Sequence, residues 1–263
     1  REPLQFGAEI YGHAGIEADL EAQELALEGL KALGVSDLVI DLSDVRLVDG
    51  VLQGLGVEGR VSASTRDQLL LALATKDAGT LRELAQDWGG NVAEALVQLT
   101  RLYGDASVLV QAKAVLPAHP LVDAALADLA QLAGRLKAAF PEVRVGFDLS
   151  DLSGYAYYSG TRFAIYGAGH ADALLRGGRY DEVGAVFGRR RPAVGFSLDL
   201  KIIAERLATL STPATRSAIS APWGDDVALR TAVRQLRQQG ETVVCVLPGH
   251  EHEVDEFDCD REL

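Results

Sequence analysis

The sequence predicts an α+β protein in which an antiparallel sheet is flanked by helices. Apolar and polar residues alternate over 157–166, and a glycine-containing loop follows, which is typical of two extended segments. Residues 64–116 are rich in Leu and Ala and read as helical, between segments that read as strands. After a short linker at 211–215, residues 216–263 show a strand–helix–strand pattern. These observations predict a sheet domain with a helical insertion and a small C-terminal α/β piece.

The first part of the chain alternates between strand and helix signals. Residues 1–12 place Leu4, Phe6, Ala8 and Ile10 on one face of a strand. Residues 16–33 have apolar residues at helical spacing, and Gly34 is a stop signal. A short apolar strand is expected at 38–42, and residues 45–55 are expected to continue toward a loop at residues 54–56.

The middle of the chain is predicted to be a helical insertion over about residues 58–118. Its helices are expected to begin at capping boxes formed by Thr65 with Gln68 and by Thr80 with Glu83, and at Asn91. Leu stripes in such helices are typical of a core rather than of a partner groove. Pro120 then opens a long amphipathic helix that ends near residue 140.

The last part of the chain returns to the sheet. Strands are expected at 143–149, in two segments within 154–180, and at 193–197. A helix is expected over 198–210, with Leu198, Ile202 and Ile203 facing inward. Beyond the linker, we expect a strand at 218–220, a helix at 225–239 and a strand at 242–247.

Composition restricts the classes of function. The 263 residues carry a formal charge of −13, which repels phosphate backbones and argues against nucleic-acid binding. Two cysteines, Cys245 and Cys259, favour a reducing compartment, and no apolar run is long enough for a membrane span. We therefore expect a cytoplasmic protein with no membrane partner. Because the sequence contains no methionine, we also expect it to be a fragment or to lack segments.

Two groups of residues suggest a small-ligand site. Gln5 and Glu9 share one strand face with Gly7 between them, and an amide and a carboxylate across a gap suit an amine-bearing ligand. The alternative is a solvated strand face. Tyr158 is flanked on its predicted face by Ala156 and Gly160, which leaves open space as in a pocket wall. The alternative is a hairpin whose tyrosines pack in the core.

Two further features are weaker. Arg189, Arg190 and Arg191 are consecutive in an acidic chain, which suggests either a phosphate site or a solvated turn. His250 and His252 alternate with glutamates, yet a His-x-His pair without a third ligand is a weak metal signal. We therefore predict neither a metal nor a cofactor.

Several motifs resemble one known family. Tyr157-Tyr158 with Gly160-Thr161, then residues 177–181 (GGRYD) and residues 193–196 (AVGF), resemble the second half of the catalytic domain of histidyl-tRNA synthetases, a class II aminoacyl-tRNA synthetase fold. Residues 1–12 resemble the end of the second class II motif; earlier motifs would precede Arg1. Three positions depart from the pattern. Ser153 and Ile202 stand where the resemblance implies arginines, and Ala156 where it implies an aspartate. Because cationic donors stabilise the ATP phosphates during adenylation, the resemblance implies the scaffold without its chemistry.

The resemblance carries expectations about site and partners. It implies a histidine pocket formed by Gln5, Glu9, Tyr157, Tyr158, Gly177, Arg179 and Tyr180. With the arginines replaced and a reduced C-terminal end, the chain resembles the regulatory subunits of ATP phosphoribosyltransferase, which are synthetase paralogues. That resemblance implies a synthetase-like domain over 1–212 and a small domain over 216–263. It also implies a non-catalytic protein that assembles with the short-form catalytic subunit, self-associates as a dimer and confers feedback by histidine. An active histidyl-tRNA synthetase, a free-standing histidine-binding module and a structural adaptor remain alternatives.

Overall fold

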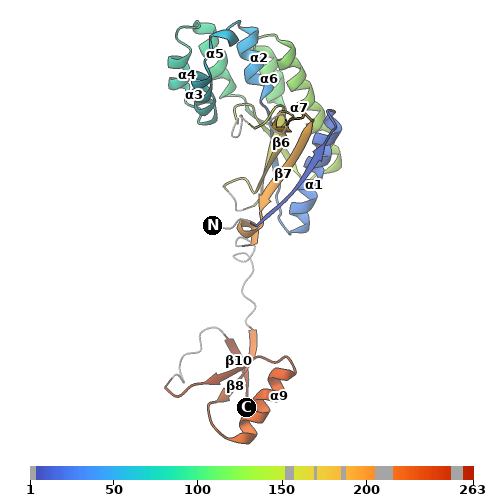
Figure 1. The fold of residues 1–263 in the computed structure, drawn as a ribbon, viewed down its shortest axis with the longest axis vertical. Helices are drawn as coiled ribbons and strands as arrows, with labels where there is room; N and C mark the ends of the chain where they lie inside the picture. The colour runs from blue at the N-terminus through green and yellow to red at the C-terminus, as the bar shows by residue number, and fades with distance from the viewer. Residues whose placement is uncertain (1–3, 152–156, 169–170, 185–187, 205–215, 250–256) are drawn as a thin grey trace. The chain divides into compact units, whose positions relative to one another are not determined.

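The computed structural model describes residues 4–151, 157–168, 171–184, 188–204, 216–249 and 257–263 (Figure 1). The chain divides into two compact units, Arg1–Ile203 and Ala204–Leu263. Each unit has its own sheet and is described separately. Within the described residues, no helix has both the length and the apolar character needed to cross a membrane.

A seven-stranded sheet forms the first unit, in the order β1-β7-β6-β5-β2-β4-β3. Every neighbouring pair is antiparallel except β2 and β4, which are parallel. In Figure 1, β1 lies against β7, although the two strands are far apart in the chain. The predicted α+β class is confirmed. The strands are β1 (Gln5–Tyr11), β2 (Val39–Asp44), β3 (Tyr103–Gly104), β4 (Arg144–Asp148), β5 (Thr161–Tyr166), β6 (Leu175–Arg179) and β7 (Ala193–Asp199).

Two long helices, α1 (Ile16–Ala32) and α7 (Pro120–Ala139), cover one face of this sheet. Both were predicted with boundaries within one residue of those observed. Their apolar residues recur at helical spacing, so that each helix buries one stripe against the strands. Pro120 is the first residue of α7. Proline is tolerated there because it lacks a backbone N–H, and N–H groups in the first turn have no partner within the helix. The side chain of His119 caps this helix by accepting from Leu121 N.

Four helices fill the region expected to be a helical insertion, with a short 3-10 turn before them. They are α3 (Ala63–Ala74), α4 (Ala78–Leu84), α5 (Gly90–Leu99) and α6 (Ser107–Val115), and the turn is η1 (Glu58–Arg60). The predicted capping boxes are wrong. Ser62 caps α3 by accepting from Thr65 N, and Asp77 caps α4 by accepting from Gly79 N and Thr80 N. Ser62 and Asp77 lie three residues before the predicted caps. Their side chains already accept hydrogen bonds from backbone N–H groups that have no partner within the first turn of the helix. Helix α5 begins at Gly90 rather than at Asn91.

Residues 45–55 were expected only to lead toward a loop, and the helix α2 (Arg46–Gly54) within them was not predicted. Leu47, Val48, Val51 and Leu52 are fully buried. Their spacing places them on one face of a helix, where α2 packs on α7. A short apolar run of this kind does not by itself distinguish a strand from a buried helix.

Two details of the later strands differ from prediction. Strand β5 begins at Thr161, so Tyr157 and Tyr158 precede it rather than belong to it. Strand β7 continues to Asp199, so the following helical residues start at 200. Ile203 is buried as predicted, but Ile202 is 43% exposed and does not face inward.

The second unit contains a three-stranded parallel sheet in the order β10-β8-β9. Its elements are β8 (Arg216–Pro222), α9 (Val227–Gln238), β9 (Val243–Val246) and β10 (Phe257–Glu262). The predicted strand–helix–strand order is present, and Ile219, Ala221, Val233 and Val243 form the core. Strand β10 was not predicted, because its sequence, FDCDRE, is mostly charged and lacks an apolar face.

Candidate functional site

Strand register divides the polar residues of the first unit between the two faces of the sheet. Residues paired across antiparallel strands point to the same face. Gln5, Gly7, Glu9 and Tyr11 of β1 therefore lie on the face opposite Phe6, whose ring lies near Gly29 of α1. We call the face that α1 and α7 do not cover the open face.

One row across the open face joins a carboxylate to a guanidinium. Glu9 pairs with Gly195, Gly195 with Gly178, and Gly178 with Arg162. With strands about 4.8 Å apart, the row spans about 14 Å between the Cα atoms of Glu9 and Arg162. The two glycines between these charges form a floor without side chains. Because neither glycine has a side chain, the side chains of Tyr158, Arg162 and Glu9 lie close to the backbone of this glycine floor.

Contacts around the two glycines show that neither position can accept a larger side chain without movement of its neighbours. A methyl group added at Gly178 would lie 2.8 Å from Tyr158 Cδ1 and 2.8 Å from Arg162 Cβ. One added at Gly195 would lie 2.8 Å from Glu9 Cγ. Any larger residue at either position would therefore displace the side chains that border the floor.

Tyrosines form one side of the site. The ring of Tyr157 lies 4.7 Å from that of Tyr180 and 5.4 Å from that of Tyr158, with the latter pair edge to face. The Tyr11 hydroxyl donates to the Glu9 carboxylate. We call Tyr11, Tyr157, Tyr158 and Tyr180 the tyrosine cluster.

Glu9 affects the tyrosines electrostatically. Burial and then the Glu9 carboxylate raise the pKa of Tyr180 and of Tyr157. The hydrogen bond to Glu9 is the main cause that raises the pKa of Tyr11. The phenols therefore stay neutral at physiological pH, as hydrogen-bond donors facing a carboxylate. The Tyr180 hydroxyl is buried and has no well-aligned hydrogen-bond partner among the described residues.

Arg162 closes the other end of the row. It is 1% exposed, lies 2.8 Å from the Asp151 carboxylate and 3.4 Å from Ser43 Oγ, and stands 5.5 Å from the centre of the Tyr158 ring. Arg176 lies 3.9 Å from the same carboxylate. Arg162 was not predicted as a site residue. In the alternating pattern over 158–166, even-numbered residues share one face, so the pattern places Arg162 on the same face as Tyr158.

Gly177 and Arg179 lie on the other face of β6. A methyl group at Gly177 would lie 2.6 Å from Phe163 Cζ, in the core beneath α1. Arg179 is 8% exposed and donates to Asp19 of α1, with Nε 3.1 Å from Oδ2. It also donates to the carbonyls of His13 (3.2 Å) and Gly15 (3.0 Å). Both residues support the strand from behind rather than line the open face.

Gln5 and Glu9 share the open face, as the alternation predicts, and both are exposed. Four residue steps along the strand place their Cα atoms about 13 Å apart, and Gln5 pairs with Asp199 rather than with a glycine. Glu9 is therefore next to the glycine floor, and Gln5 lies toward its edge.

The remaining candidates lie elsewhere. Arg189, Arg190 and Arg191 are exposed, and Arg190 pairs with Glu182 at 2.9 Å, which supports a solvated turn. Ser153, Ala156, His250 and His252 lie outside the described residues. Among the described residues, no group of three or more His, Cys, Asp and Glu side chains is arranged to hold a metal ion.

Comparison with known proteins identifies related sequences for both units. Residues 1–203 match the family model described as histidyl-tRNA synthetase, and residues 216–263 match one described as the ATP phosphoribosyltransferase subunit HisZ C-terminal domain. A protein named ATP phosphoribosyltransferase regulatory subunit, from Acidovorax sp. (strain JS42), is 56% identical over 263 residues, which is 100% of this chain and 66% of that protein. The chain thus spans slightly less than two thirds of that relative.

Solved structures share the fold. A Bacillus halodurans structure described as an ATP phosphoribosyltransferase regulatory subunit/histidyl-tRNA synthetase matches 98% of this chain and 67% of its own, at 25% identity and a TM-score of 0.73. A structure described as the ATP phosphoribosyl transferase (HisG:HisZ) complex from Thermotoga maritima matches 75% of this chain and 66% of its own, at 19% identity and a TM-score of 0.58. The chain belongs to the histidyl-tRNA synthetase family, and relatives that match it over its whole length are named ATP phosphoribosyltransferase regulatory subunits.

Proposed function

We propose that the chain is part of a non-catalytic regulatory subunit of ATP phosphoribosyltransferase, needed for the first step of histidine biosynthesis and for its feedback regulation. The observation that carries the proposal is the match over all 263 residues to relatives with that name. The match of residues 216–263 to the HisZ C-terminal domain supports it independently of the synthetase-like unit.

The open face suits histidine as the regulatory ligand. Glu9 is exposed next to the glycine floor and supplies a negative charge for an amine or imidazolium, and the tyrosine cluster supplies flat walls and donors. We place the ligand against Glu9, Tyr157, Tyr158 and Tyr180. Gln5 borders this area, whereas Gly177 and Arg179 hold β6 in place.

The proposed lack of catalysis rests on the residue types at the expected arginine positions. Ser153 and Ile202 carry no positive charge, and Ala156 carries no carboxylate. By the family resemblance, Ile202 stands at a position where ATP phosphates would need a cation. The proposed role is therefore to bind histidine and to change the activity of a partner subunit, which carries out the reaction.

The proposed partner is the short-form catalytic subunit of ATP phosphoribosyltransferase, in a hetero-oligomer that also contains a dimer of this subunit. A ligand regulates such an assembly only if it binds two assembly states with different affinity. The cytoplasm is the proposed location, since Cys245 and Cys259 are both free thiols.

The first experiment is co-purification of the chain with a short-form catalytic subunit, followed by the phosphoribosyltransferase rate with and without histidine. We expect association, stimulation of the rate and its reversal by histidine. Glu9→Ala should weaken the histidine response roughly tenfold to a hundredfold, because it removes a charged hydrogen-bond partner. Glu83→Ala, which removes an exposed carboxylate on α4, is the matched control and should leave the response unchanged.

The outcomes separate the alternatives. Histidine-dependent ATP–pyrophosphate exchange by the chain alone would identify an active synthetase, which the family match favours as the second candidate. Histidine binding without association would indicate a free-standing module. Association that ignores histidine would indicate an adaptor. An unchanged histidine response in Glu9→Ala would show that regulatory histidine does not bind at the open face.

A further inference from the structure

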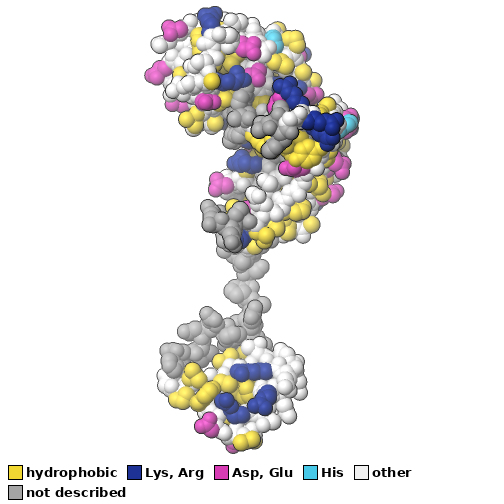
Figure 2. All heavy atoms as spheres, in the orientation of Figure 1, with side chains coloured by type: hydrophobic (Ala, Val, Ile, Leu, Met, Phe, Trp, Pro, Cys, Tyr) yellow, Lys and Arg dark blue, Asp and Glu magenta, His cyan; other side chains and the backbone are white. Residues whose placement is uncertain are grey.

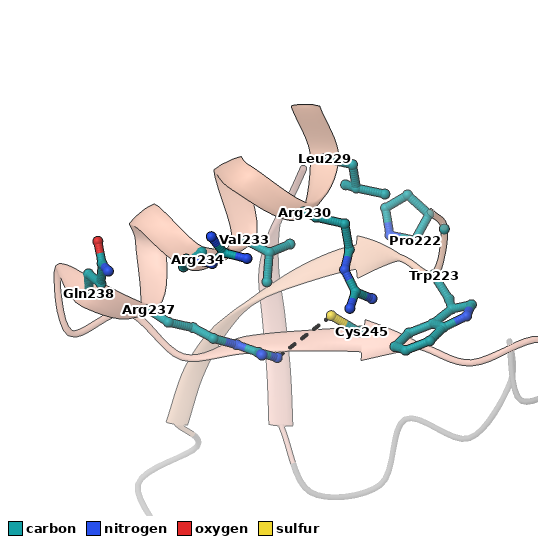
Figure 3. A pocket seen from close by; sticks show the side chains of 10 residues that line it. Pro222, Trp223, Leu229, Arg230, Val233, Arg234, Arg237, Gln238 and Cys245 are labelled. Atoms are coloured by element: carbon teal, nitrogen blue, oxygen red, sulfur yellow. Dashed lines mark hydrogen bonds between the residues drawn. The ribbon is translucent and has the colours of Figure 1, made fainter. Parts of the chain in front are cut away.

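Helix α9 of the second unit carries an arginine stripe. Arg230, Arg234 and Arg237 recur at intervals of four and three residues, which places them on one side of the helix. Figure 3 shows the three side chains around the space between α9 and β9. Figure 2 shows Lys and Arg side chains gathered on the visible face of this unit, beside hydrophobic ones.

These arginines border a cavity of about 440 Å³ between α9, β9 and the end of β8. Trp223 and Pro222 form one wall, and Cys245 of β9 lies at the base. Trp223 is 49% exposed, and the Arg230 guanidinium stands 5.1 Å from the centre of its ring system. The cavity therefore combines an accessible aromatic surface with three cationic groups.

Among the described residues, these arginines form no ion pair with an acidic side chain, whereas Arg261 of the same unit does. Arg237 donates to the Val243 carbonyl at 2.9 Å and contacts Cys245 Sγ at 3.6 Å, and Arg230 contacts Trp223. In the same unit, Arg261 forms a two-pronged pair with Glu241, at 3.1 and 2.7 Å. Guanidinium groups that form no ion pair within the described part of the chain are unexpected around a cavity of a protein with charge −13.

We propose that this cavity binds a phosphorylated small molecule with a planar ring, of the mononucleotide class. Guanidinium forks match phosphate oxygens, so Arg234 and Arg237 hold the phosphate group. The indole of Trp223 packs against the planar base, as aromatic side chains do with nucleobases. The cavity volume lies in the range of small-molecule sites rather than of extended interfaces. The site is independent of the open face of the first unit.

Fluorescence titration tests the proposal on the whole chain. Trp88 and Trp223 are its two tryptophans, so Trp88→Phe leaves Trp223 as the sole emitter. We expect AMP to change the emission of Trp223. Adenosine lacks the phosphate group and ribose 5-phosphate lacks the base, so each should bind at least about tenfold more weakly than AMP. Raising the ionic strength should weaken AMP binding.

Two arginine variants make the matched comparison. Arg234→Gln should weaken AMP binding about tenfold or more, because it removes a charged donor to phosphate. Arg261→Gln removes the same charge from the same unit away from the cavity and should leave AMP affinity within about twofold. Absence of AMP binding at millimolar concentration would overturn the proposal, as would equal losses in the two variants. Ribose 5-phosphate or a glutamate-rich peptide that binds as tightly as AMP would also overturn it.

Cysteine alkylation gives a second readout without fluorescence. Cys245 lines the cavity, whereas Cys259 on β10 does not, and both are partly buried. Saturating AMP should slow the reaction of Cys245 with iodoacetamide several-fold and leave that of Cys259 unchanged. Equal rates at Cys245 with and without AMP would place the nucleotide elsewhere and contradict the assignment.

Discussion

The Arg179 guanidinium and the Asp19 carboxylate connect β6 to α1 in the interior of the first unit. Thr161 of β5 donates to the same carboxylate, so three elements meet at one buried charge pair. Removing one partner leaves the other charge buried and uncompensated. Arg179→Gln should therefore lower the free energy of unfolding by about 3–5 kcal/mol, measured as a shift of the urea midpoint.

Arg190 is the matched control for this prediction. It also pairs with a carboxylate, that of Glu182, but its side chain is 75% exposed. Arg190→Gln should cost less than about 1 kcal/mol, because water screens an exposed pair. Equal shifts in the two variants would show that Arg179 does not anchor the fold.

Asp41 predicts a pH dependence of stability. Burial raises its pKa above the usual value, and Asp148 and Asp151 raise the pKa further. The folded state therefore holds this proton more tightly than the unfolded state, and stability falls as pH rises from about 4 through the raised pKa. Asp41→Asn removes this penalty. Its gain over the parent should be absent near pH 3 and grow as pH rises, in urea titrations across pH 3–8. A constant difference would contradict the prediction.

Sequence reasoning found part of the site for a clear physical reason. Alternation along a single strand is local, so the shared face of Gln5 and Glu9 follows from residue parity; the same parity would have placed Arg162 with Tyr158, although Arg162 was not predicted. Which face of β6 belongs to the site depends on its register with β5 and β7. That register is non-local, and Arg179 was therefore expected in the pocket although it faces α1.

At the scale of elements, the contact between α2 and α7 depends on a glycine. A methyl group at Gly50 would lie 2.6 Å from Val122 Cγ2 and 3.0 Å from Val122 N. Gly50→Ala should therefore destabilise the protein by about 1–3 kcal/mol despite the higher helix propensity of Ala. The measurement is the thermal midpoint.

Gly134 is the control within α7. Nothing lies within 4 Å of a methyl group placed there. Gly134→Ala should stabilise by about 0.5–1 kcal/mol, because it reduces the freedom of the unfolded chain. If Gly50→Ala stabilised equally, the two helices would not be held at the described separation.

The same contact explains why the helix α2 was not predicted. The apolar residues of 45–55 suit either a strand or a short helix, and packing of α2 on α7 decides for the helix. Long periodic segments such as α1 and α7 were predicted almost to the residue, because many positions repeat the same signal. Strand β10 carries almost no such signal, and its pairing with β8 is a tertiary effect.

At the scale of the whole molecule, each unit buries its own core and carries its own proposed ligand site. The open face of the first unit has Glu9 beside a glycine floor, which suits an amine, whereas the cavity of the second unit is cationic. An exposed carboxylate at the one site and a lining of arginines at the other imply different ligands. Regulation by either ligand then requires that the unit concerned change its stability or its contacts when loaded.

Separate cores predict separate unfolding. Trp88 lies in the first unit and Trp223 in the second, so Trp88→Phe and Trp223→Phe each leave a reporter for one unit. The second unit has the smaller core and should unfold at lower urea concentration, since a smaller domain buries a smaller fraction of its surface.

Val233→Ala, a core truncation in α9, should lower only the Trp223 midpoint, by an amount that corresponds to about 1–3 kcal/mol. A Leu27→Ala change in α1 is the reciprocal control and should lower only the Trp88 midpoint. Coincident midpoints that move together in both variants would instead mean that the two units unfold as one cooperative body, and a ligand bound to one unit would then stabilise the other.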